Sequence, residues 1–402
     1  MTDFDQQLAA ELSALREADL LRQLRCVESP AGTRASLDGR ELLNFSSNDY
    51  LGLASHPALK EAAIKAVEKW GAGSGASRLV CGSLAVHHEL EEALADFKGT
   101  EAALTFSTGY AAAQGAIVAL LGKGDILIVD KLIHACVVDA AKVCGAKLRV
   151  FRHNDLNDLE AKLKWARKQQ TTVGDRRSAR ILIVTESVFS MDGDLAPLRN
   201  LVELKDRHGA WLMVDEAHAL GVVGTRGHGM HEYYGIDPNE VDIWMGTLSK
   251  TLSACGGYIA GNASLIEWLK HSAPGFVYSV GLAPALAAAA LESLAIMHAE
   301  PERVARLHAN AALFLGLARE AGFDTGTASA HAIIPVILGS SIAAARYSQL
   351  LLARGINVQP IIYPAVAEKA ARLRFFISSE HTDADIRATI AALIAIRAEA
   401  KK

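Results

Sequence analysis

Short apolar runs and amphipathic stretches alternate along the middle of the chain, between about residue 102 and residue 272. Continuous apolar runs are typical of strands buried on both faces, whereas apolar residues spaced three and four apart are typical of helices. Strands are predicted at Ala102–Phe106, Ile126–Val129, Lys147–Phe151, Ile181–Thr185, Trp211–Val214, Ile243–Met245 and Gly257–Ala260. Helices are predicted between them at Tyr110–Leu121, Ile133–Val143, Leu156–Gln169, Leu198–His208 and Ala263–Ser272. This alternation predicts an α/β fold with a mostly parallel central sheet covered on both faces.

The two ends of the chain have a different pattern. Residues from about 3 to 25 have the period of an amphipathic helix, and Arg34–Phe45 is predicted to form a hairpin around Asp38-Gly39. The remaining elements are predicted as helices Ala58–Trp70, His87–Phe97, Ala283–His298, Pro301–Ala321 and Asp383–Ala398, and as strands Ile333–Leu338, Ile356–Pro360 and Leu373–Ser378. We therefore expect an N-terminal arm and hairpin at 1–45, a large domain at 46–282 and a smaller C-terminal α+β domain at 283–402.

Composition excludes several classes of function. The 402 residues are 50% hydrophobic and 21% charged with a net charge of -4, so no basic surplus suggests a nucleic-acid partner. The five cysteines form no C-x-x-C pair, which argues against a zinc site or a disulfide framework and favours the cytoplasm. The N-terminal stretch lacks the apolar core of a signal peptide. Apolar windows such as Ala283–Ile296 are too short to span a bilayer, so we expect no membrane insertion.

One lysine stands where chemistry is expected. The predicted strand Ile243–Met245 leads into Thr247-Leu248-Ser249-Lys250, and Gly256-Gly257 follows. Hydroxyls and open backbone amides suit a phosphate, and glycines let the backbone approach a flat ring closely. A lysine in this setting is a candidate for Schiff-base chemistry, although a solvated lysine at a strand end is the commoner case.

Other polar residues follow the same edge of the predicted sheet, where ligands of open α/β sheets bind. They are Ser107-Thr108-Gly109-Tyr110 at a helix start, His134, the loop Glu186–Asp194 with Ser190, and Asp215, Ala217 and His218. The helix start is either an anion site or an ordinary N-cap, and a lone histidine is more often structural. Asp215 and His218 lack a nearby third ligand, so no metal is predicted. Phosphate-loop, dinucleotide-binding and nucleophile-elbow motifs are absent.

Together these residues fit pyridoxal 5'-phosphate (PLP). Lys250 would hold the cofactor as a Schiff base, and Asp215 would pair with the pyridine nitrogen so that the ring withdraws electrons. His134 would stack on the ring, and His218 would donate a hydrogen bond to its phenolic oxygen. The helix start at Gly109-Tyr110, with Thr247, would bind the phosphate. Lys250, His134 and Asp215 are the predicted catalytic residues.

Several longer motifs carry a family resemblance. They are NDYLGL (Asn48–Leu53), GSGASRLVCGS (Gly73–Ser83), HHELEEALADFKGTEAAL (His87–Leu104), HND (His153–Asp155), TESVFSMDGDLAPL (Thr185–Leu198), VDEAHALGVVGTRGHG (Val214–Gly229) and GTLSKTLSACGGYIAG (Gly246–Gly261). From about residue 15 to its end the chain resembles the α-oxoamine synthases, PLP-dependent transferases of fold type I. The resemblance implies a homodimer with shared active sites and a decarboxylating condensation of an amino acid with an acyl thioester. It completes the predicted cofactor set as Ser107, Thr108, Gly109, Tyr110, His134, Glu186, Ser190, Asp215, Ala217, His218, Thr247, Ser249, Lys250 and Ser279.

The same resemblance implies a substrate site. Arg372 would bind the amino-acid carboxylate, since an arginine fork matches a carboxylate, and a surface arginine is the alternative. Asn48, Ser77 and His134 would line this pocket. Arg22 matches an arginine that meets the distal carboxylate of a pimeloyl chain in the biotin-pathway members.

Two positions depart from the pattern of those members. Ala365 stands where a threonine would contact substrate, and Val280 stands where a threonine would approach the phosphate from the neighbouring subunit. Both changes remove a hydroxyl, so they leave the cofactor chemistry intact and the acyl group open. The expected reaction joins L-alanine with pimeloyl-CoA, or its acyl carrier protein (ACP) form, to give 8-amino-7-oxononanoate. The alternatives are a relative that uses glycine or serine with a longer, uncharged thioester, and a non-catalytic PLP-binding protein.

Overall fold

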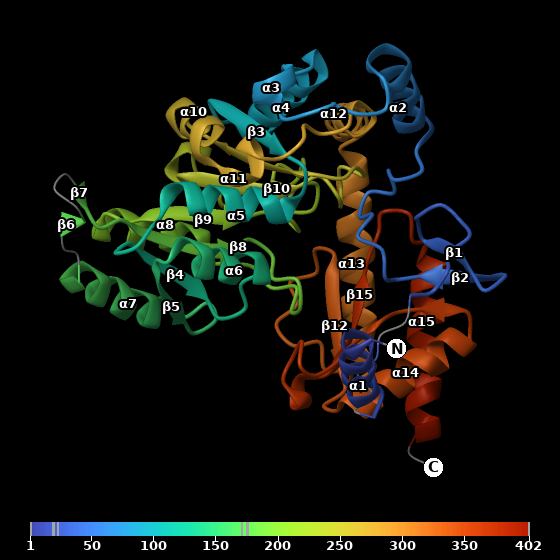
Figure 1. Cartoon of the computed structure of the whole chain (residues 1–402). Coiled ribbons are helices and arrows are strands. Elements are labelled where there is room, and N and C mark those ends of the chain that lie inside the picture. Colours follow the sequence, from blue (N-terminus) through green and yellow to red (C-terminus); the bar gives the residue numbers. More distant parts are fainter. Residues whose placement is uncertain (1, 18–20, 22–23, 170–171, 174–176, 401–402) are drawn as a thin grey trace.

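A seven-stranded sheet forms the centre of the chain, in the order β3-β11-β10-β9-β8-β4-β5 (Figure 1). The computed structural model describes residues 2–17, 21, 24–169, 172–173 and 177–400. The strands are β3 (Ala102–Phe106), β4 (Ile126–Asp130), β5 (Lys147–Phe151), β8 (Ile181–Glu186), β9 (Trp211–Asp215), β10 (Ile243–Thr247) and β11 (Gly257–Gly261). β11 runs antiparallel to β3 and β10, and the other neighbours are parallel. The predicted α/β fold with a mostly parallel sheet is therefore confirmed.

Two apolar cores cover the two faces of this sheet. Side chains alternate across a strand, so Ile126 and Ile128 of β4 enter one core while Leu127 and Val129 enter the other. The first core is covered by helices α2 (Pro57–Trp70), α4 (Ala85–Lys98), α7 (Leu156–Gln169), α8 (Leu198–His208) and α12 (Pro284–Ala299). The second is covered by α5 (Gly109–Leu120), α6 (Ala135–Cys144), α10 (Ala263–Ser272) and α11 (Pro274–Val277). Burial on both faces explains the apolar runs of the inner strands β4 and β8, whereas β5 at the edge of the sheet is only partly buried and carries Lys147 and Arg149.

The C-terminal part contains two small sheets. Their strands are β1 (Arg34–Leu37), β2 (Arg40–Asn44) and β13 (Ile356–Asn357) in one, and β12 (Ile333–Ile337), β15 (Arg372–Phe376) and β14 (Pro360–Ile361) in the other. The helices beside them are α13 (Glu302–Glu320), α14 (Ser341–Ala353) and α15 (Asp383–Ala400). The predicted hairpin is confirmed, with Asp38 and Gly39 at φ +51° and +70° in its turn. Because β2 also pairs with β13, the hairpin belongs to this C-terminal part.

Some predicted boundaries were wrong. The predicted strand Ile356–Pro360 is two short strands that pair with different sheets, and the alanine-rich helix α14 was missed. Short elements also lay outside the prediction, namely α3 (Arg78–Cys81), β6 (Thr172–Val173), β7 (Arg177–Ser178), α9 (Met230–Tyr234), α11 (Pro274–Val277) and the 3-10 turns Pro238–Glu240 and Glu368–Ala370. The domain boundary near residue 282 stays a prediction, although α12 packs against α2 and α4 of the sheet-bearing part.

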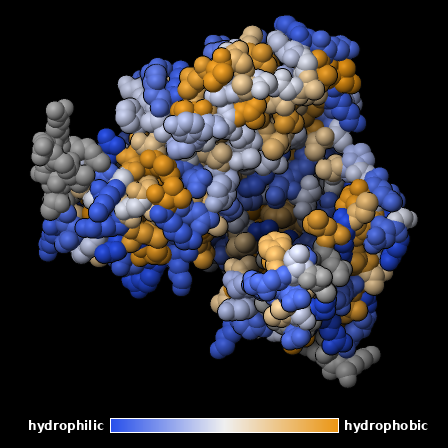
Figure 2. Space-filling view, viewed as in Figure 1, coloured by the Kyte–Doolittle hydropathy of each residue, from blue (hydrophilic) through white to orange (hydrophobic). Residues whose placement is uncertain are grey.

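The N-terminal helix α1 (Asp3–Glu17) has no buried side chain. Its apolar residues Phe4, Leu8, Leu12 and Leu15 are all exposed. None of the helices in the described ranges combines the length and the apolar character needed to cross a bilayer. Figure 2 shows that this face of the molecule is hollowed between the sheet-bearing part and the C-terminal part.

Candidate active site

Strand register brings the predicted residues together at one edge of the central sheet. Glu186 is the partner of Asp215 across β8 and β9, and Asp215 is the partner of Met245 across β9 and β10. Lys250 lies three residues after the end of β10, at the same edge of the sheet. Parallel strands end at the same edge, and residues far apart in the sequence therefore converge here.

A cavity of about 320 Å³ opens at this edge. Twelve predicted cofactor residues line it: Thr108, Gly109, Tyr110, His134, Glu186, Ser190, Asp215, Ala217, His218, Thr247, Ser249 and Lys250. The sequence prediction did not include four further lining residues, Cys136, Met245, Cys255 and Gly256. The volume is in the range of small-molecule sites.

The amine of Lys250 is held by a hydrogen-bonded pair of side chains. Lys250 Nζ lies 2.8 Å from His218 Nε2, and the other ring nitrogen of His218 lies 2.7 Å from the Tyr50 hydroxyl. Burial and the nearby Lys250 charge hold the pKa of His218 well below its usual range, so the ring is neutral. Tyr50 was missed because its contact with His218 spans 168 residues, although it lies inside the NDYLGL motif.

Burial also tunes the lysine and the carboxylates around it. Burial lowers the pKa of Lys250 to about 8, although the charges of Asp215 and Glu186 act in the opposite direction. Burial raises the pKa of Asp215, and burial together with the Asp215 charge raises that of Glu186. About one tenth of Lys250 is therefore a neutral amine at pH 7, and this is the form that attacks a carbonyl carbon.

The opposite end of the cavity is built for an anion. Helix α5 begins at Gly109, and the hydroxyl of Thr108 caps it by accepting from the Ala111 amide at 2.9 Å. The Thr247 hydroxyl, 2.8 Å from that of Ser249, lies beside this helix start. A Cβ on residue 257 would lie 2.5 Å from the Gly109 Cα, so only glycine lets β11 pass the helix start this closely.

His134 is oriented by its place at a helix start. It is the N-cap of α6, and its Nδ1 accepts from the Cys136 amide at 3.3 Å. The Cys136 thiol lies 3.1 Å from the same nitrogen, and burial raises its pKa, so it stays protonated. The ring of His134 is thus fixed on the wall of the cavity.

The prediction for Arg372 disagrees with the geometry. Its guanidinium forms an ion pair with Asp192 at 2.6 Å and donates to the Met191 carbonyl at 2.9 Å, and its side chain is 5% exposed. Arg374, two residues further along β15, forms no such ion pair with any side chain that the structure describes. It donates to the Ser190 carbonyl at 2.9 Å, its buried Nε has no partner in the described residues, and its charge lowers the pKa of both Lys250 and His218.

The other predicted substrate residues lie outside the cavity lining. Asn48 accepts a 3.4 Å hydrogen bond from the Tyr50 hydroxyl, and it is connected to Lys250 through Tyr50 and His218. Ser77 donates to the Val277 carbonyl at 3.0 Å, and Ala365 is exposed beyond β14. Arg22 lies outside the described residues.

The remaining predicted cofactor residues, Ser107 and Ser279, contact each other at 3.2 Å in a smaller hollow. Within the described ranges no group of three or more histidine, cysteine, aspartate or glutamate side chains is placed to hold a metal ion.

Comparison with known proteins decides the family. The sequence model of the aminotransferase class I and II family matches residues 40–393. The chain is 45% identical to the 8-amino-7-oxononanoate synthase of Geobacter sulfurreducens over 98% of both chains, and 43% identical to that of Symbiobacterium thermophilum over 99% of this chain and 98% of the relative. The chain belongs to the α-oxoamine synthases. Among solved structures, a serine palmitoyltransferase from S. paucimobilis with bound PLP and myriocin is similar at 32% identity, with a TM-score of 0.88 and 98% of each chain covered.

This α-oxoamine synthase is a PLP-dependent enzyme of the acyltransferase type. Its cavity fits the cofactor on its own chemistry. Asp215 is a buried carboxylate that would stabilise a pyridinium, and the α5 start with Thr108 and Thr247 would receive the phosphate. Lys250 lies between them with a neutral amine available.

Proposed function

We propose that this enzyme condenses L-alanine with a pimeloyl thioester, releasing the thiol and CO₂, to give 8-amino-7-oxononanoate for biotin synthesis in the cytoplasm. The observation that carries the proposal is the full-length identity of 40–45% to curated 8-amino-7-oxononanoate synthases, joined to a cavity that holds a depressed-pKa lysine and a buried aspartate. Among solved structures, the serine palmitoyltransferases are 31–32% identical and an 8-amino-7-oxononanoate synthase from Francisella tularensis is 27% identical, so the choice of reaction rests on the sequence relatives.

The cofactor, when bound, supplies an electrophilic carbonyl carbon and a cationic ring that accepts negative charge from the substrate α-carbon. Lys250 contributes an amine that is half neutral near pH 8, so its Nζ would hold the cofactor and, when free of it, could take the α-proton of the substrate. Asp215 is buried and would pair with the ring nitrogen of the bound cofactor and keep it protonated. His218 is neutral, and its contacts with Lys250 and Tyr50 hold it in reach of the same centre.

Arg374 is our proposed partner of the amino-acid carboxylate, in place of Arg372. The support is its buried Nε without a partner in the described residues and its electrostatic influence on Lys250. The guanidinium of Arg372 is already paired with Asp192 and donates to two backbone carbonyls. A guanidinium whose N–H groups already donate to protein acceptors is a poor site for a substrate carboxylate. A buried guanidinium N–H without a partner instead favours the binding of an anion.

A second copy of the chain is proposed to complete the site. The loop that carries Ser77 packs against the segment around Val280, as the Gly281 amide donates to the Ala76 carbonyl at 3.2 Å. Large apolar side chains at this place, Leu79, Val80, Tyr278 and Val280, are 52–87% exposed. Apolar exposure of this extent beside a ligand site supports a homodimer with shared active sites.

The acyl group and its carrier are tested together. Purified enzyme is incubated with L-alanine, glycine or serine against pimeloyl-CoA, pimeloyl-ACP or palmitoyl-CoA, and free thiol and CO₂ are measured. The proposal predicts turnover with L-alanine and a pimeloyl thioester and none by Lys250→Ala. Turnover of glycine or serine with palmitoyl-CoA, and none with L-alanine, would overturn it.

A further inference from the structure

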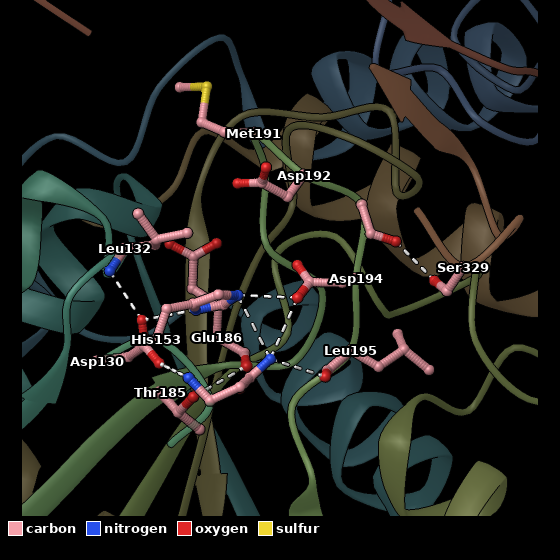
Figure 3. Close-up of polar contacts among 12 residues, drawn as sticks. Asp130, Leu132, His153, Thr185, Glu186, Met191, Asp192, Asp194, Leu195 and Ser329 are labelled. Atoms are coloured by element: carbon pink, nitrogen blue, oxygen red, sulfur yellow. Dashed lines mark hydrogen bonds and ion pairs between the residues drawn. The ribbon is translucent and has the colours of Figure 1, made fainter. Parts of the chain in front are cut away.

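His153 lies between two carboxylates at the edge of the central sheet. Its Nδ1 is 3.0 Å from Asp130 Oδ1, and its Nε2 is 2.8 Å from Asp194 Oδ2 (Figure 3). His153 follows β5, whereas Asp130 ends β4 and Asp194 belongs to the loop after β8. One imidazole therefore joins three segments that meet beside the cofactor cavity. The HND motif contains this residue, and the proposed reaction gives it no role.

Geometry determines the protonation of this imidazole. Both ring nitrogens lie at hydrogen-bond distance from an oxygen of an aspartate, and an ionised carboxylate only accepts. Both nitrogens must then donate, so the ring is a cation between two anions. In agreement, burial lowers the pKa of His153 but the hydrogen bonds to Asp130 and Asp194 outweigh it and raise the pKa to about 10.

Asp130 connects His153 to the segment that leads to His134. The Asp130 carboxylate is fully buried, and besides His153 it accepts from the Leu132 amide at 2.8 Å and the Asn154 amide at 2.9 Å. Leu132 lies two residues before His134, whose ring forms a wall of the cofactor cavity. The imidazolium thus fixes the turn that aims this ring.

Asp194 connects His153 to the loop from Ser187 to Leu195. This loop closes on itself through the amide of Phe189, which donates to the Asp194 carbonyl at 3.0 Å, and through a bridge between Val188 and Leu195. The ring of Phe189 packs edge-on against His153, with 4.4 Å between ring centroids. Figure 3 shows Met191 and Asp192 at the far end of this loop, away from His153.

The same loop carries the groups that set the substrate site. Ser190 lines the cavity, its carbonyl accepts from Arg374 at 2.9 Å, and Asp192 pairs with Arg372. Next to Asp192, the Gly193 carbonyl accepts from the Ser329 hydroxyl at 2.6 Å, which connects the loop to the C-terminal part. A displacement of the loop therefore moves the Ser190 carbonyl that orients the Arg374 guanidinium, while the backbone of Arg374 stays in the paired strand β15.

We propose that His153 is a positioning residue for this reaction. Its cation clamps Asp130 to Asp194 and so fixes the loop Ser187–Leu195, which sets the place of Arg374 and of the substrate carboxylate. His153 touches neither substrate nor cofactor in this arrangement, and it acts through Asp194 and the loop. The inference rests on the proposed function only for the choice of L-alanine as the probe.

The test compares charge-matched variants of PLP-loaded enzyme. With both aspartates ionised, Asp130, His153 and Asp194 together carry one net negative charge. His153→Asn leaves the two facing carboxylates without a cation between them. The concentration of L-alanine that gives half of the visible absorbance change, with no thioester present, should rise about tenfold or more in His153→Asn, since a small misplacement of an orienting group is costly. Asp194→Asn keeps an acceptor for His153 and should change it by less than about threefold.

The double variant His153→Asn with Asp194→Asn restores one net negative charge, and it should recover most of the affinity for L-alanine. His271→Asn, at a histidine that is paired with a carboxylate but exposed, is the matched control and should behave as wild type. Thermal unfolding of each variant without PLP, and PLP affinity by titration, separate a general loss of stability from the substrate effect. If His153→Asn does not fold, the L-alanine half-saturation of Asp194→Ala is compared with that of Asp194→Asn. Asp194→Ala removes the acceptor for His153 and should raise the half-saturation more than Asp194→Asn, which keeps one.

An L-alanine half-saturation within about twofold of wild type for folded His153→Asn, or no recovery in the double variant, would overturn the positioning role. A wild-type enzyme that responds only to glycine or serine instead contradicts the proposed substrate. The His153 comparison is then made with the amino acid to which the wild type responds.

Discussion

The protonation of Lys250 should control how fast the enzyme without PLP captures the cofactor. Only the neutral amine attacks the carbonyl carbon, and burial lowers the pKa of Lys250 to about 8. The neutral fraction is then about one half at pH 8 and about one hundredth at pH 6, whereas an unshifted lysine would be about one part in 250 neutral at pH 8. The rate of PLP capture should rise about tenfold per pH unit below pH 8 and level off above it.

Stopped-flow absorbance at a series of pH values measures this rate, and Lys250→Ala should show no capture. Substitution of Asp215 is the more specific test, because the negative charge of Asp215 favours the ammonium form of Lys250. Asp215→Asn should therefore move the midpoint of the pH profile below that of the wild type. A wild-type rate that continues to rise to pH 10, or a midpoint that moves upward in Asp215→Asn, would refute the reasoning.

Other predictions concern the arginine pair and the cofactor end of the cavity. Arg374→Lys should raise the KM for L-alanine about 10- to 100-fold, since it removes a charge-assisted contact worth roughly 1.5–3 kcal/mol, while Arg372→Lys should act mainly on thermal stability. Steady-state kinetics on both variants decide the assignment, and the reverse pattern would return the role to Arg372. Gly257→Ala places a Cβ 2.5 Å from the Gly109 Cα and should cost about 1–3 kcal/mol of stability and weaken PLP binding. Gly316→Ala, with open space around its Cβ, is the control in melting and PLP titration, and equal behaviour of the two variants would count against the close approach.

The central sheet and most of the cavity were predictable because they depend on local patterns. Apolar runs buried on both faces locate the strands, and the turn residues after each strand are then at one edge. Lys250, Asp215 and Thr108 were placed together by that rule alone. Helix α14 was missed because its alanine-rich sequence gives little contrast between apolar and polar faces.

Contacts between distant segments were not predictable from local pattern. Arg372 and Arg374 lie two apart in β15, so both point to the same face, and period alone cannot separate them. The contact with Asp192 distinguishes the two arginines, because this residue pairs with Arg372 from a loop 180 residues away in the sequence. Tyr50 likewise reaches His218 only through the packed fold.

The most direct test of the central claim is the release of free thiol from pimeloyl-CoA or pimeloyl-ACP in the presence of L-alanine, with CO₂ and 8-amino-7-oxononanoate measured in the same reaction. The account predicts equal amounts of the three products from the wild type and none from Lys250→Ala. A PLP-loaded wild type that forms no 8-amino-7-oxononanoate from L-alanine with either thioester would contradict it.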